Sequence, residues 1–107
     1  MPRSKKHADD NPPSHLSAES KAIWRELVPT RAKNRERREL LTIALEARDR
    51  VADARRAVAK EGLTQTTKKT GAIHVHPMLK VERDARAQFL AAWIKLRFDV
   101  EESNLLL

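Results

Sequence analysis

Apolar residues recur at helical spacing in two long stretches of the chain, and a segment of different pattern separates them. Within residues 35–61 they fall every three or four positions, which predicts one long amphipathic helix. This stripe comprises Leu40, Ala44, Ala47, Val51, Ala54 and Val58. Residues 77–98 repeat the pattern and predict a second long helix, with a stripe comprising Met78, Val81, Ala85, Phe89, Ala92 and Leu96.

A shorter helix is predicted over residues 17–28, ahead of the two long ones. Ser17 is a suitable N-cap, because its hydroxyl can accept a hydrogen bond from a free backbone N–H of the first turn. Pro29 ends the helix, since the residue before a proline avoids the helical region. The apolar side of this helix carries Ile23, Trp24, Leu27 and Val28, and Trp24 is expected to be a core or interface anchor.

The segment between the two long helices predicts a β-hairpin. Gly62 stands where a helix C-terminus favours glycine, and Pro77 stands at the start of the next helix. The β-branched runs 63–67 and 72–75 are the expected strands, joined by Lys68, Lys69, Thr70 and Gly71. Because a lone two-stranded hairpin is marginal in water, we expect it to pack on the helices or on another subunit.

The predicted fold is mainly α: a short N-terminal helix, then a long antiparallel helix pair joined by a small β-hairpin. We expect a disordered basic tail over residues 1–15, a helical oligomerisation domain over 16–98, and an acidic, leucine-ended tail over 99–107. The helix over 77–98 has a second apolar face, which needs helix 17–28 or another subunit to cover it. We therefore expect a homo-oligomer larger than a tetramer, with a coiled-coil-like seam and an interface at Trp24, Phe89, Trp93 and Ile94.

Charge indicates a polyanionic partner. The chain has 107 residues, a net charge of +7 and 35% charged residues. Residues 81–107 carry four basic and five acidic side chains, so the positive excess lies in residues 1–80. The basic stretch at residues 30–39 contains no aromatic residue that could stack on a base. This favours contact with phosphates over recognition of the bases. The expected DNA contacts are Arg31, Lys33, Arg35, Arg37 and Arg38, with Lys68 and Lys69 second.

Several kinds of chemistry are not expected. The chain has no cysteine, and His74 and His76 alone make at most half of a metal site, so no metal is predicted. Helix capping is the better interpretation of His76. No glycine-rich phosphate loop or nucleophile–base pattern is visible, which argues against an enzyme and predicts no cofactor. No apolar run is long enough to span a membrane and no signal peptide is evident, so a cytoplasmic protein is expected.

The end of the chain changes character. Residues 99–107 are acidic and then finish in three leucines. These residues fit two interpretations: a peptide that docks on a partner protein, or a chain end without a function. The docking interpretation rests on Leu105, Leu106 and Leu107.

These motifs together resemble those of small terminase subunits of tailed phages, of the HK97-like type. Residues 13–29, which read PSHLSAESKAIWRELVP, are similar to the opening of that family. The segment AVAKEGLT at 57–64, a Lys/Thr/Gly turn and then HPML at 76–79 follow its helix–hairpin–helix order. The resemblance covers about residues 12–96.

The resemblance implies a non-catalytic ring adaptor in a phage or a gene transfer agent. It would engage DNA for packaging, with weak binding and little sequence preference, and would recruit or regulate the large terminase subunit. Two other classes stay open: a small dimeric nucleic-acid-binding regulator, and a toxin–antitoxin-like or structural helical partner without nucleic acid. The number and kind of subunits in the assembly distinguish the three classes: a ring of many subunits, a dimer or a heteromer.

Overall fold

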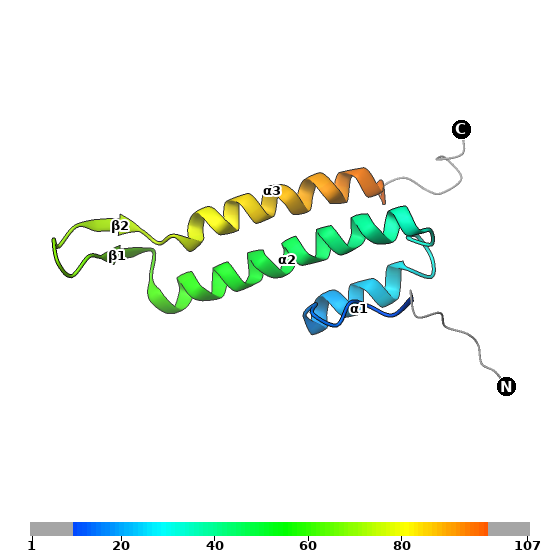
Figure 1. The fold of residues 1–107 in the computed structure, drawn as a ribbon, viewed down its shortest axis with the longest axis horizontal. Coiled ribbons are helices and arrows are strands. Elements are labelled where there is room, and N and C mark those ends of the chain that lie inside the picture. Colours follow the sequence, from blue (N-terminus) through cyan, green and yellow to red (C-terminus); the bar gives the residue numbers. More distant parts are fainter. Residues whose placement is uncertain (1–9, 99–107) are drawn as a thin grey trace.

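A computed structural model describes residues 10–98, and within them the predicted mainly helical fold is confirmed. The elements are α1 (Ala18–Leu27), α2 (Arg35–Glu61), β1 (Thr64–Thr66), β2 (Ile73–Val75) and α3 (Met78–Leu96). In Figure 1, α2 and α3 lie side by side along most of their length, and α1 lies against the N-terminal half of α2. The hairpin projects beyond the other end of the helix pair.

Capping residues set the helix boundaries. The hydroxyl of Ser17 accepts a hydrogen bond from the Ser20 N–H at 3.1 Å, so the predicted cap of α1 is confirmed. At α2 the side chain of Asn34 accepts from the Arg37 N–H at 2.8 Å. The same helix ends at Gly62, whose φ of 92° is a conformation that glycine adopts without a steric penalty.

Small residues allow the two long helices to approach each other. Ala44, Ala47 and Ala54 of the predicted α2 stripe are buried, and α3 contributes the buried Ala85 and Ala92. All five alanines belong to the two predicted apolar stripes, so this part of the prediction is confirmed. The alanines bury little apolar area, so larger side chains elsewhere must supply most of the hydrophobic stabilisation.

The large core residues lie where α1, α2 and the end of α3 meet. Leu41 and Leu45 of α2 are fully buried there, although the predicted stripe did not include them. The cluster comprises Leu16, Trp24, Val28, Ala32, Leu41, Leu45 and Leu96. Leu41 and Leu45 extend the apolar surface of α2 toward α1, so α2 has neighbours on two sides.

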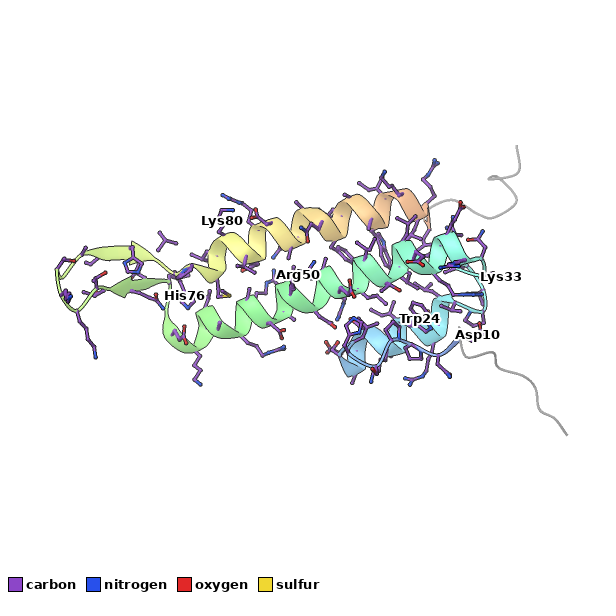
Figure 2. The ribbon with its side chains drawn as sticks, viewed as in Figure 1. Asp10, Trp24, Lys33, Arg50, His76 and Lys80 are labelled. Atoms are coloured by element: carbon purple, nitrogen blue, oxygen red, sulfur yellow. The ribbon has the colours of Figure 1, made fainter. Side chains whose placement is uncertain are left out.

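Residues 10–15 contact the helices. They were expected to be disordered, yet the carbonyl oxygen of Asp10 accepts a hydrogen bond from Trp24 Nε1 at 2.9 Å. His15 contacts Glu46 at 2.8 Å, and the next residue, Leu16, is buried. The physical reason is that a buried indole N–H needs an acceptor, and this segment supplies one (Figure 2).

The hairpin is antiparallel and has the predicted turn region. Thr64 pairs with Val75, Gln65 with His74 and Thr66 with Ile73. Each strand has three residues, slightly fewer than predicted. Gly71 takes a φ of 73° in the connection, and its N–H donates to the Thr67 carbonyl at 2.7 Å.

The molecule is a single layer of elements. Its extents are 65 × 38 × 17 Å, and the smallest is less than two helix diameters of roughly 10–12 Å each, so the helices are not stacked in two layers. Both broad sides of the layer and the outer edge of α3 therefore face outward. Within residues 10–98, no helix is long and apolar enough to cross a bilayer.

Candidate nucleic-acid and subunit interfaces

Two of the predicted DNA contacts, Arg31 and Arg37, hold the end of α3. The guanidinium of Arg31 lies 5.1 Å from the centre of the Phe98 ring and donates to the Phe98 carbonyl. Arg37 lies 5.3 Å from the same ring, donates to the Leu96 carbonyl, and bonds the Arg31 carbonyl at 2.8 Å. Cations beside the last carbonyls of a helix favour its dipole, so these arginines contribute to the fold.

Arg38 also turns back toward its own chain. It donates to the Lys33 carbonyl at 2.5 Å and lies 3.8 Å from the carboxylate of Asp10. Arg35 points outward, with 91% of its side chain exposed and Glu39 3.5 Å away. Lys33 is exposed at the same end of the molecule (Figure 2). Of the five predicted contacts in this stretch, Lys33 and Arg35 are thus the most available to phosphates.

The secondary contacts, Lys68 and Lys69, are exposed in the connection between β1 and β2. Figure 1 places this connection at the opposite end of the molecule from the α1–α2 loop that carries Lys33. One chain therefore does not bring the two predicted groups together, and they are two separate surfaces.

The positive excess of the helical body is larger on the side of the hairpin. Residues 50–86 carry nine basic and four acidic side chains, a net charge of +5. Residues 10–49 and 87–98, which form the other half, carry ten basic and seven acidic side chains, a net charge of +3. The carboxylates of residues 10–49 offset much of the basic stretch at 31–38, so the hairpin half is the more attractive to a polyanion.

Ion pairs organise part of this basic half. Glu82 of α3 accepts from Arg55 of α2 at 3.0 Å and from Arg86 at 2.6 Å. These hydrogen bonds, first from Arg55 and then from Arg86, hold the pKa of Glu82 below its ordinary value. Two arginines share one carboxylate, so the local charge stays positive.

Asp49 is a structural carboxylate that sequence reasoning missed. Its oxygens accept from the Ser17 N–H at 2.8 Å and from the hydroxyls of Ser17 and Ser20 at 2.7 and 2.6 Å. Burial acts to raise the pKa of Asp49, yet these hydrogen bonds outweigh it and hold the pKa below its usual value. The serine pair at the start of α1 was the available signal.

The four predicted subunit-interface residues have different surroundings. Trp24 is 3% exposed in the core of its own chain, so one chain already covers it. Phe89 and Trp93 stack at 5.1 Å, and Trp93 meets the Phe98 ring edge-on at 5.2 Å. Ile94, by contrast, is 66% exposed.

The outward face of α3 carries an apolar stripe that no other part of residues 10–98 covers. Leu90 is 49% exposed, and Ala87 and Ala91 are exposed beside it. With Ile94, these residues have the spacing i, i+3, i+4 and i+7 that puts side chains on one face of a helix. We name Ala87, Leu90, Ala91 and Ile94 the outer stripe. The structure leaves this stripe open because α1 packs on α2 instead.

His76 caps a helix, as the sequence indicated. Its Nδ1 accepts a hydrogen bond from the Met78 N–H at 3.0 Å, and its Nε2 lies 2.5 Å from a carboxylate oxygen of Glu61. The ring is buried at the base of the hairpin (Figure 2), whereas His74 is exposed. Among residues 10–98, no three or more His, Cys, Asp or Glu side chains cluster in a way that could hold a metal ion. The predicted docking residues Leu105, Leu106 and Leu107 lie outside the described part of the chain.

Comparison with known protein families gives one match. A family model described as phage terminase, small subunit, matches residues 18–101. This span includes every helix and strand of the described structure, from the start of α1 to the end of α3. Comparisons with curated proteins and with solved structures found no significant match.

Proposed function

The chain belongs to the phage terminase small subunit family, and on that premise we propose that it is a non-catalytic adaptor for DNA packaging. It assembles as a homo-oligomer larger than a tetramer, contacts DNA weakly with little sequence preference, and works with the large terminase subunit. It acts in the cytoplasm of the bacterial host. Catalysis then belongs to the large subunit, and this chain contributes binding surfaces.

The observation that carries the DNA-binding part is the net charge of +5 over residues 50–86. Lys68 and Lys69 lie exposed at the tip of this half, away from the carboxylates that offset the 31–38 stretch. We therefore assign the main phosphate contacts to the hairpin half and give Lys33 and Arg35 the second place. Contact through lysines at a loop tip neutralises phosphates without reading bases.

Mobility shifts at several salt concentrations, on cognate and random DNA, test this assignment. The log of the association constant should fall with the log of salt by about 0.9 for each phosphate neutralised. Lys68→Gln/Lys69→Gln should reduce that slope by about 2, about 1 for each lysine. Lys33→Gln/Arg35→Gln should reduce it less.

A matched control removes the same charge from α1, in Lys21→Gln/Arg25→Gln. If this control weakens binding as much as the hairpin variant, net charge alone explains the affinity and the assignment is wrong. Strong preference for one DNA sequence would also contradict the proposal.

The outer stripe of α3 is the proposed contact between copies. Its two large side chains, Leu90 and Ile94, are half or more exposed, and the alanines between them allow another helix to come close. A dimeric regulator could also use this face, so the mass of the assembly decides between the two classes. Light scattering at tens of micromolar protein should give a mass above that of a tetramer; a monomer or dimer would rule out the ring adaptor.

A further inference from the structure

The hairpin presents an apolar surface that the described part of its own chain, residues 10–98, leaves uncovered. Ile73 and Val75 are 72% and 61% exposed and point to the same side of β2, because alternate residues of a strand share a face. Thr66 and Thr64 stand opposite them on β1. The hairpin projects beyond the helix pair (Figure 1), and a two-stranded sheet of this size is marginal in water without further packing.

The base of the hairpin is nevertheless held firmly. The His76 N–H donates to the Leu63 carbonyl at 2.9 Å. The ring of His76 joins Glu61, at the end of α2, to the first N–H of α3. These contacts tie both strands to both helices, so the hairpin offers a preorganised surface with two lysines at its tip.

We propose that residues 101–107 of one copy bind along residues 69–75 of a second copy, in the same chain direction. This segment lies outside the described residues, but the order of its charged and apolar residues matches that of the hairpin. Glu101 is followed by leucines four and six positions later, at Leu105 and Leu107. Lys69 is followed by Ile73 and Val75 at the same two intervals.

Leu105 and Leu107 are two residues apart, as are Ile73 and Val75, so an extended segment beside β2 aligns the two pairs, because every strand rises by about 3.3 Å per residue. Leu105 then faces Ile73 and Leu107 faces Val75, and the preceding Glu101 and Glu102 lie toward the turn that carries Lys68 and Lys69. The leucines cover the exposed β-branched side chains, and the carboxylates lie near the basic tip, where they compete with DNA phosphates for Lys68 and Lys69. An extended peptide beside an open strand edge also finds backbone hydrogen-bond partners.

The two segments cannot meet within one chain. The 19 residues of α3 span roughly 28 Å at 1.5 Å per residue, and β2 lies beyond the far end of this helix from Phe98. The seven residues from Phe98 to Leu105 reach at most about 25 Å when fully extended. The hairpin must therefore receive the segment from another copy, which joins copies head to tail.

This inference depends on one part of the proposed function, namely that several copies of the chain assemble. Docking of residues 99–107 on the large terminase subunit is the alternative that the sequence suggested. The hairpin is favoured because a surface of matching charge and apolarity exists on this chain.

Disulfide trapping tests the contact directly, because the chain has no cysteine. Val75→Cys and Leu107→Cys are made as separate full-length proteins, mixed without DNA or large subunit, and oxidised gently. The mixed disulfide should form several-fold more than in a mixture of Leu107→Cys with Ala22→Cys, whose cysteine is exposed on α1. Equal yields in the two mixtures would overturn the proposal.

Charge reversal adds a second readout. Lys68→Glu/Lys69→Glu in the Val75→Cys copy should lower the yield several-fold, and Glu101→Lys/Glu102→Lys in the Leu107→Cys copy should restore it. Failure of the rescue would contradict the predicted alignment. In a single chain carrying both cysteines, a predominant intrachain disulfide would contradict the reach argument.

Deletion of residues 103–107 separates this contact from the alternative. Amide hydrogen exchange of Ile73 and Val75 should become several-fold faster in the shortened protein. If exchange stays unchanged while binding to purified large subunit is lost, the segment docks on that subunit and the inference fails. The light-scattering mass reports on assembly independently, so a failed trap in an intact oligomer leaves the proposed function standing.

Discussion

At the scale of single residues, the carboxylate of Asp49 shows how one side chain organises the start of a helix. Three donors from Ser17 and Ser20 converge on it, and they fasten α1 to α2 across 29 to 32 positions of sequence. Burial opposes the charge, while the hydrogen bonds favour it more strongly. The charged form of Asp49 is thus the form that stabilises this helix contact.

We predict that Asp49→Asn costs about 1–3 kcal/mol of unfolding free energy near neutral pH, because the charge-assisted hydrogen bonds weaken. The folded pKa of Asp49 is lowered. Its contribution is therefore complete above the unfolded value of about 3.9 and is lost as pH falls through the folded pKa. Urea unfolding between neutral and acidic pH should show a smaller acid-dependent loss in the variant. Asp53→Asn, on the exposed side of α2, is the control; an unchanged acid profile in Asp49→Asn would contradict the prediction.

Trp24 leads to a second prediction at this scale. Its indole joins the core cluster and bonds the Asp10 carbonyl, so Trp24→Ala should cost about 3–5 kcal/mol, as for other large core truncations. Trp24→Phe keeps most of the ring and should cost less. Chemical denaturation measures both, and a loss of oligomer mass without loss of subunit stability would instead favour an interface role.

At the scale of elements, the hairpin depends on its attachment through His76. The His76 ring accepts from the first N–H of α3 and contacts the last residue of α2. A strand pair of three residues each has little stability of its own. Its order therefore depends on this capping contact and on whatever covers its apolar face.

We predict that His76→Ala speeds amide exchange in β1 and β2 while the N-terminal half of α2 keeps its protection. His76→Asn should retain part of the protection, because an asparagine side chain can also accept the Met78 N–H. His74→Ala is the matched control, because His74 is exposed in β2 two residues earlier. If His74→Ala has the same effect as His76→Ala, the histidine contact is not what orders the hairpin.

At the scale of the whole molecule, a one-layer fold leaves α3 with an open edge. Leu90 and Ile94 lie on that edge, whereas Trp93 contributes to the packing of its own chain. Ile94→Asp should therefore lower the light-scattering mass with little change in helicity. Trp93→Ala should lower subunit stability as well as mass, so it is the less selective test. An unchanged mass in Ile94→Asp would exclude the outer stripe as the contact between copies.

The order and type of the elements could be predicted from the sequence because they depend on local signals. Ser17, Gly62 and the period of the apolar residues act within a few positions of their own place in the chain. For this reason α2 matches its predicted bounds and the hairpin has its expected turn. The capping role of His76 was also predictable, since it concerns a neighbouring turn of α3.

Only the tertiary structure decided which charged and aromatic residues are available for binding. Arg31 and Arg37 looked like phosphate contacts until Phe98, more than sixty positions away, came to lie against both guanidinium groups. Trp24 looked like a subunit anchor until Leu41, Leu45 and residue 10 enclosed it. The sequence specifies the charge and size of each side chain. Whether that side chain already contacts other residues of its own chain depends on which segments folding brings together. That long-range information has no local signal.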